Sequence, residues 1–185
     1  KNLARNYFQI AECNLKYVCD LDTEKLNQMR SHMPGTIMTT RWQDLLDDTE
    51  LQAVVIATTA GYHYQLCKSA LLAGKDVYVE KPIGNSIAEC NVMVAAQKRY
   101  SRAVQVGQWQ RSMPHFVEAL DYLRTGKIGQ IRTVKAWAYQ GWMKNIVVAP
   151  DKPAPAGVNY NMWLGPAPKR PFNENRFHFN FRWFW

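Results

Sequence analysis

The sequence has few of the features that mark several large classes of protein. Its 185 residues include no apolar run approaching the ~20 residues that a membrane helix needs, so we expect no membrane partner. The four cysteines form no CxxC pair, which argues against a zinc site or a redox dithiol and predicts that the chain holds no metal. We interpret them as reduced thiols, which favours a cytoplasmic location.

A concentrated patch of positive charge is also absent. The formal net charge is +8, and a basic balance can indicate nucleic acid or an anionic ligand as partner. The lysines and arginines are scattered and form no basic helix or repeated stripe, so we favour an ordinary solvated surface over a nucleic-acid interface. Hydrophobic residues make up 47% of the chain, which is enough for a core and argues against disorder.

The glycine-rich turn that opens a dinucleotide-binding fold is missing as well. Such a turn follows the first strand and precedes the first helix. Residues 2–10 have the pattern of a helix that has already begun, so we expect the first strand and the glycine turn to precede Lys1. An export signal lost from the same end stays an open alternative to the cytoplasmic location.

Strand and helix patterns alternate through the first part of the chain. The run at 53–57 is wholly apolar, which is typical of a parallel strand buried on both faces. The alternation predicts a doubly wound parallel α/β sheet, a Rossmann-like fold, over residues 1–112. The expected strands are 15–20, 36–39, 53–57, 76–80 and 103–106, and the expected helices are 2–10, 23–30, 42–46, 62–72 and 86–100.

The rhythm changes after Gly107, and we place a domain boundary near Ser112. Residues 113–185 are expected to begin a second domain. Residues 114–124 have apolar side chains at helical spacing, and 131–139 alternate like a long strand. Residues 140–171 are rich in Pro, Asn and Gly and predict an extended loop.

Ligands of a doubly wound sheet bind at the carboxyl ends of its strands. The polar residues expected there are Asp20, Thr58, Thr59, Glu80, Lys81 and Gln108. A carboxylate at the position of Asp20 can accept hydrogen bonds from the ribose hydroxyls of adenosine, and it repels a 2′-phosphate, which favours NAD over NADP. The alternative is an aspartate that caps the next helix, a role that Asp22 could fill equally.

Two further features follow the strand at 53–57. The small Thr58 and Thr59 allow the backbone to approach a cofactor closely, whereas the alternative is a plain turn with a threonine helix cap. His63 lies in the first turn of the next helix, where it is a candidate cofactor contact. A lone histidine in such a place is more often a packed or capping residue than a catalyst.

The Glu80-Lys81-Pro82 segment is the sharpest feature of the sequence. A strand delivers Lys81 to the edge of the sheet, and Pro82 rigidifies the turn. An ammonium buried there beside a cofactor can hold a substrate hydroxyl and stabilise a developing alkoxide, and Glu80 can orient it or contact the cofactor ribose. The alternative is a surface turn with an incidental ion pair.

These motifs together resemble the Gfo/Idh/MocA oxidoreductase family, which includes glucose–fructose oxidoreductase and inositol dehydrogenase. The similarity is strongest in VEKPIG at 79–84 and AGKDV at 73–77, and it extends from residue 3 to residue 129. It includes VCD at 18–20, VIATT at 55–59 with His63, VGQ at 106–108 with Arg111, and WLGPAP at 163–168.

The resemblance implies an NAD(P)-dependent enzyme of two domains. The second domain would be of the α+β kind, with a large open sheet that commonly mediates homo-oligomers. The lysine that matches Lys81 contacts the substrate hydroxyl that is oxidised. Many members have Thr-Pro where this chain has Thr58-Thr59, which puts the local turn geometry in doubt. The catalytic Asp and His of the family have no counterpart here and are expected beyond Trp185, so the general base is unassigned.

The leading interpretation is hydride transfer between a nicotinamide and a hydroxyl-bearing carbon of a sugar, cyclitol or polyol, with Lys81 catalytic. One alternative is an NAD-dependent glycoside hydrolase of the same fold, which works by oxidation and elimination. Another is a non-catalytic NAD-binding regulator or a nucleic-acid binder, against which the intact lysine and the lack of a basic face argue. The expected cofactor contacts are Asp20, Thr58, Thr59, His63, Glu80, Lys81 and Gln108.

Overall fold

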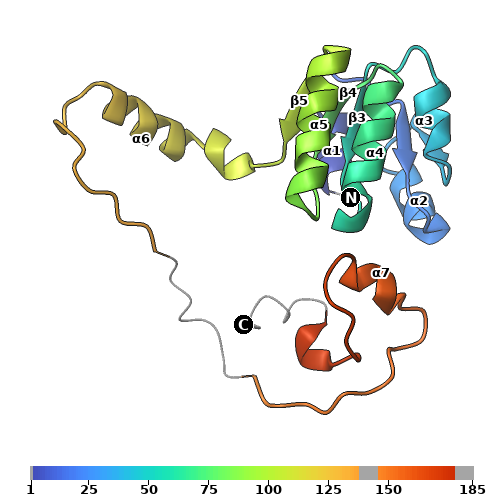
Figure 1. Ribbon diagram of the computed structural model, residues 1–185. Helices are drawn as coiled ribbons and strands as arrows, with labels where there is room; N and C mark the ends of the chain where they lie inside the picture. The colour runs from blue at the N-terminus through green and yellow to red at the C-terminus, as the bar shows by residue number, and fades with distance from the viewer. Residues whose placement is uncertain (1, 138–145, 178–185) are drawn as a thin grey trace. The chain divides into compact units, whose positions relative to one another are not determined.

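The computed structural model describes residues 2–137 and 146–177. The chain forms two compact units, Lys1–Gly107 and Gln108–Trp185, and Figure 1 shows the elements of each. No helix among the described residues is both long and apolar enough to cross a membrane.

The first unit alternates strand and helix along the chain (Figure 1). Helix α2 has the predicted bounds, and the other elements differ from prediction by one or two residues at an end. The strands are β1 Tyr17–Cys19, β2 Ile37–Thr39, β3 Ala53–Ile56, β4 Asp76–Val79 and β5 Val104–Val106; the helices are α1 Asn2–Phe8, α2 Thr23–Arg30, α3 Gln43–Asp47, α4 Ala60–Leu72 and α5 Ile87–Tyr100.

Every strand pair of the first unit is parallel. Strand β1 pairs with β2, and a second ladder has the order β3-β4-β5. Strand β4 is thus central in its ladder, with Val77 opposite Val54 on one side and Val104 on the other. This arrangement confirms the predicted doubly wound α/β class. Because the strands run in one direction, the carboxyl ends of β3, β4 and β5 lie at one edge.

The core of the first unit lies between the β3-β4-β5 ladder and helices α4 and α5, which lie side by side over it in Figure 1. The side chains of alternate strand residues point to this face, since the side-chain period of a strand is two. Full burial of one such side chain contributes about 1.5–3 kcal/mol. The fully or nearly fully buried members are Ile56, Val77, Val79, Cys67, Ala70, Leu71 and Met93.

The opposite face of β3 corrects one prediction. The strand was expected to be buried on both faces, but Ala53 is exposed and Val55 is 37% exposed. The cause is that α4 and α5 cover only the face that carries Val54 and Ile56. On the other face the described contact is between rings, with Tyr7 of α1 meeting Tyr78 of β4 edge-on at 6.3 Å between centroids.

Local capping signals set the helix ends, as predicted. The Asp22 carboxylate accepts the backbone N–H groups of Glu24 and Lys25 at the start of α2. At the start of α5 the Ser86 hydroxyl accepts the N–H of Glu89 at 3.2 Å, while the Glu89 carboxylate reaches back to the N–H of Asn85 at 2.7 Å. The capping box therefore closes one residue earlier than its usual form.

The second unit contains less regular structure in its described part. Helix α6, Pro114–Arg124, forms as predicted, and its side chains Phe116, Val117, Leu120 and Leu123 are 40–48% exposed. The strand expected at 131–139 is not formed over 131–137, and residues 138–139 lie outside the described part. A strand needs a partner ladder, and no described strand runs beside these residues.

The loop predicted at 140–171 contains a short helix that the sequence did not predict. Within the described residues 146–171, helix α7 spans Tyr160–Leu164, and an isolated antiparallel bridge joins Lys152 to Phe172. The aromatic rings of this region gather on α7, with Tyr160 stacked on Trp163 at 5.5 Å and edge-on to Phe172 at 5.3 Å. Short 3-10 turns occur at Trp109–Ser112 and Glu174–Arg176.

Candidate functional site

The carboxyl edge of the β3-β4-β5 ladder brings together two polar turns. We call residues 57–60, after β3, the Thr58 turn, and residues 80–84, after β4, the Lys81 turn. The ladder continues one step past the strands, because Glu80 donates its N–H to Ile56 O at 2.9 Å and Gly107 donates to Val79 O at 2.8 Å. The chain segments that leave the three strands therefore start side by side.

Glu80 lies across the end of β5. Its carboxylate accepts the backbone N–H of Lys81 at 3.1 Å and the Tyr78 hydroxyl at 3.4 Å. A Cβ built on Gly107 would lie 2.8 Å from the Glu80 carboxyl carbon, so only glycine leaves room for the carboxylate there. Burial, followed by the charge of Glu80, raises the pKa of Tyr78.

Lys81 stands at the outer point of its turn and is exposed. The buried ammonium considered from the sequence is not observed, because Lys81 is exposed in the described chain. The following peptide bond, Lys81-Pro82, is cis. Lys81 is therefore not enclosed by the described residues of the first unit.

His63 is buried, with 1% of its surface exposed, in the first turns of α4. Its Nδ1 lies 2.6 Å from the carbonyl oxygen of Pro82, and its Nε2 lies 3.0 Å from the carbonyl oxygen of Thr58. The ring thus contacts one backbone carbonyl group in each of the two turns. Of the two roles considered for it, the packed histidine matches these surroundings, since both ring nitrogens face backbone carbonyl groups of the protein.

The two threonines leave their side chains at the surface. Thr59 is the N-cap residue of α4 by its backbone, but its side chain makes no capping hydrogen bond. The Thr58 hydroxyl donates to the carbonyl oxygen of Thr59 at 3.3 Å, and both residues are exposed. The threonine helix cap considered as an alternative is therefore not formed, and the turn stays open to a ligand.

Asp20 follows β1 directly, in the other ladder of the first unit. Its backbone N–H donates to Thr39 O at 3.3 Å, and its carboxylate accepts the N–H of Asp22 at 3.0 Å. The helix cap of α2 is Asp22, so the capping role offered as an alternative for Asp20 belongs to its neighbour. The Asp20 side chain is exposed at a strand end.

Gln108 begins the second compact unit, at the N-cap position of the turn Trp109–Ser112. The site that the first unit contains is accordingly made of Thr58, Thr59, Glu80 and Lys81, with Asp20 at the end of the neighbouring ladder. The sequence did not single out Tyr78 or Gly107 as supports of Glu80. A glycine directly after a buried strand was the available signal for close approach.

A doubly wound parallel sheet with polar turns at its carboxyl edge is the arrangement of a nucleotide-binding α/β domain. Residues 1–108 match the model of an oxidoreductase family with an NAD-binding Rossmann fold, Gfo/Idh/MocA, and residues 125–185 match the model of its C-terminal alpha/beta domain. The chain belongs to the Gfo/Idh/MocA oxidoreductase family.

Curated relatives agree with this assignment. An uncharacterised oxidoreductase of Bacillus subtilis is 27% identical over 131 residues, which cover 71% of this chain and 38% of the relative. An inositol 2-dehydrogenase of Salmonella typhimurium is 33% identical over 90 residues, which cover 48% of this chain and 27% of the relative. The chain thus spans well under half the length of these relatives.

Solved structures share the fold. The myo-inositol 2-dehydrogenase of Lactobacillus plantarum superposes with a TM-score of 0.64 at 27% identity, over 69% of this chain and 38% of that one. The scyllo-inositol dehydrogenase of Lactobacillus casei, solved with bound NAD(H) and scyllo-inositol, gives 0.64 at 26% identity, over 68% of this chain and 38% of that one.

Proposed function

We propose that this protein is an NAD-dependent dehydrogenase that moves a hydride between nicotinamide and a hydroxyl-bearing carbon of a sugar, cyclitol or polyol. The observation that carries the proposal is the Lys81 turn. It places an exposed ammonium at the carboxyl end of the central strand β4, beside the open Thr58 turn. Membership of an oxidoreductase family and similarity to inositol dehydrogenases support the reaction class.

Each residue has a role in this proposal. Lys81 donates a hydrogen bond to the reacting hydroxyl and stabilises the negative charge that develops on its oxygen as the hydride leaves carbon. The Glu80 carboxylate packs against Gly107 and accepts the N–H of Lys81. These contacts support the start of the Lys81 turn. The residue that takes the hydroxyl proton is unassigned, and we expect it in the second domain.

The residues present fit a dinucleotide. The exposed Thr58 turn lets a ligand approach its backbone, and the Asp20 carboxylate, which does not cap α2, is available at a strand end to accept ribose hydroxyls. Glu80, through its carboxylate, and Gln108 are further proposed contacts. When bound, the nicotinamide supplies the hydride chemistry, while the protein supplies orientation and charge.

The test is reduction of NAD by the whole protein. A panel of cyclitols, sugars and polyols is offered with NAD or NADP, and net formation of reduced nicotinamide is recorded by its absorbance. We expect one class of hydroxyl substrate to support turnover with NAD. Cleavage of a glycoside without net release of NADH would instead assign the oxidation and elimination chemistry. Absence of turnover with every compound would contradict the dehydrogenase.

The remaining partners are predictions. We propose a small sugar-like molecule as substrate and a homo-oligomer formed through the second domain, with a cytoplasmic location. The mass of the purified whole protein in solution checks the oligomer, and a monomer at micromolar concentration would contradict it.

A further inference from the structure

The surroundings of His63 give its ring two contacts of the same kind. Both ring nitrogens face backbone carbonyl oxygens, Pro82 O at 2.6 Å and Thr58 O at 3.0 Å. A carbonyl oxygen only accepts hydrogen bonds, so the hydrogen bond in such a contact comes from a ring N–H. Whichever ring nitrogen carries the proton therefore donates to the carbonyl oxygen that it faces. The ring is 1% exposed and so is shielded from bulk solvent.

The two carbonyl groups belong to the two turns of the site. Thr58 O is in the turn after β3, and Pro82 O is one residue past Lys81. The ring itself is carried by α4, whose neighbouring side chains Cys67 and Leu71 are fully buried in the core. Helix α4 is therefore linked to both turns through the imidazole ring of His63.

We propose that His63 is a positioning residue that fixes the Lys81 turn relative to the Thr58 turn. The inference rests on the proposed function, in which Lys81 holds the reacting hydroxyl and the Thr58 turn lines the cofactor site. His63 touches neither ligand and acts through the two carbonyl groups. It keeps the hydroxyl and the hydride acceptor at their working separation, where a shift of about 1 Å can cost on the order of 100-fold in rate.

The role depends on the hydrogen bonds of this side chain and not on its bulk alone. Leucine at position 63 keeps comparable bulk in the core but makes no hydrogen bond. Glutamine keeps an amide with two N–H groups that can reach at least one carbonyl oxygen. Leu71→Ala is the matched control, because Leu71 is a fully buried residue of the same helix that packs in the core. It reports the effect of loosening α4 without removing a hydrogen bond to either turn.

The experiment measures backbone hydrogen exchange by mass spectrometry on the whole protein, together with steady-state kinetics. In His63→Leu, peptides that cover residues 57–62 and 80–86 should exchange at least about 10-fold faster than in the Leu71→Ala control. The kcat should fall by about 10-fold or more, while KM for NAD changes little, as expected for lost positioning. His63→Gln should recover part of both losses.

The outcomes separate the inference from the proposed function. If His63→Leu and Leu71→Ala give the same exchange pattern, or if glutamine rescues nothing, His63 is only a core residue and the inference fails. If exchange rises selectively in the two turns but Lys81→Ala keeps full turnover, the proposed function fails while the link between the turns stands. Should His63→Leu not fold, the comparison of His63→Gln with wild type decides the same question.

Discussion

Lys81 is exposed on the first unit, and its ammonium is the group that the proposed reaction needs. Lys81→Ala should lower kcat by about 100-fold or more, because removing one donor that stabilises a developing oxyanion costs on that order. NAD affinity should change much less. Steady-state kinetics and an NAD titration measure the two effects.

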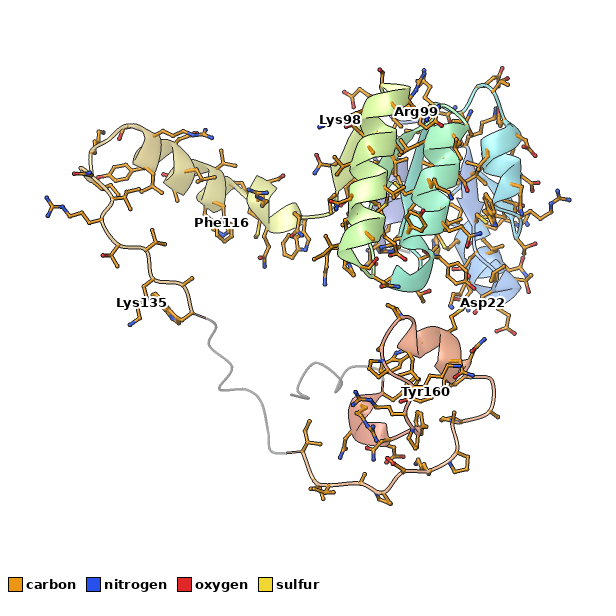
Figure 2. The ribbon with its side chains drawn as sticks, viewed as in Figure 1. Asp22, Lys98, Arg99, Phe116, Lys135 and Tyr160 are labelled. Carbon is orange, nitrogen blue, oxygen red and sulfur yellow. The ribbon has the colours of Figure 1, made fainter. Side chains whose placement is uncertain are left out.

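The matched control is Lys98→Ala, which removes an exposed lysine from the last turn of α5, labelled in Figure 2. It should behave as wild type. Near-normal turnover in Lys81→Ala would mean that the lysine only shapes its turn.

Asp20 is the residue expected to set cofactor preference. Its carboxylate is free of helix capping, so it can accept ribose hydroxyls and repel a 2′-phosphate. We expect the whole protein to bind NAD more tightly than NADP, and Asp20→Ala to weaken NAD more than NADP. Fluorescence titrations with both cofactors measure this, and NADP binding as tight as NAD binding in the wild type would rule the assignment out.

Gly107 tests the support of Glu80. A Cβ at this position would lie 2.8 Å from the Glu80 carboxyl carbon, so Gly107→Ala must displace the carboxylate. Overpacking at a buried position costs about 1–3 kcal/mol, and kcat should fall as the Lys81 turn loses its base. Gly61→Ala is the control, since its Cβ would meet only Asn85 Nδ2 at 3.9 Å. Equal melting temperatures for the two variants would argue against the close approach.

At the scale of elements, two ion pairs tie Lys16, directly before β1, to the segment after α3. Lys16 Nζ lies 2.6 Å from Asp48 and 2.8 Å from Glu50. The hydrogen bond from Lys16, with help from the N–H of Glu50, lowers the pKa of Asp48 from 3.8 to about 2, and the same carboxylates raise the pKa of Lys16.

Because the folded pKa of Asp48 lies below its unfolded value, the pair contributes stability above about pH 4 that is lost as the pH falls toward 2. Asp48→Asn should lower the denaturation midpoint at neutral pH, and its difference from wild type should shrink on acidification. Urea melts across this range measure it. Asp47→Asn, at an exposed neighbour, is the control; a difference that does not depend on pH would contradict the ion pair.

The elements that the sequence predicts well are those whose ends are set locally. The bounds of α2 and α6 come out as expected, because Asp22 caps α2 and Pro114 opens α6 within their own segments. Helix α7 was missed because its Asn159 cap lies in a stretch whose Pro and Gly content indicates a loop. The strand at 131–139 and the two-sided burial of β3 depend on distant neighbours, which no local pattern contains.

The same distinction applies to the site. Reading the ends of strands placed Asp20, Thr58 and Lys81 at a carboxyl edge, and their ligand contacts stay predictions. The approach of Glu80 to Gly107 and the two carbonyl contacts of His63 arise only when β4, β5 and α4 pack together. Those contacts join residues 19 to 27 positions apart in the sequence, except for the Thr58 contact within the α4 turn.

At the scale of the whole molecule, the first unit carries two separate ladders, β1-β2 and β3-β4-β5. Strands β1 and β3 are edges of these ladders, Val55 is partly exposed, and the apolar side of α6 is exposed within the described chain. An unpartnered strand edge or apolar helix face is a liability when the total stability is only about 5–15 kcal/mol.

We therefore predict that residues 1–185, made alone, do not fold stably or bind NAD tightly. A thermal melt of this segment with and without NAD decides the matter. A cooperative transition that NAD shifts upward would contradict the prediction.

The central place of β4 has a consequence for the order in which the first unit unfolds on heating. This strand is hydrogen-bonded on both sides and keeps Val77 and Val79 in the core, whereas β1 and β2, among the described strands, pair only with each other. On warming, the parts of a protein with the lowest local stability unfold first. We therefore expect β4, which is followed by Lys81, to unfold last. The end of β1, which is followed by Asp20, should unfold early. Mild heating should therefore reduce the preference for NAD over NADP before it abolishes turnover.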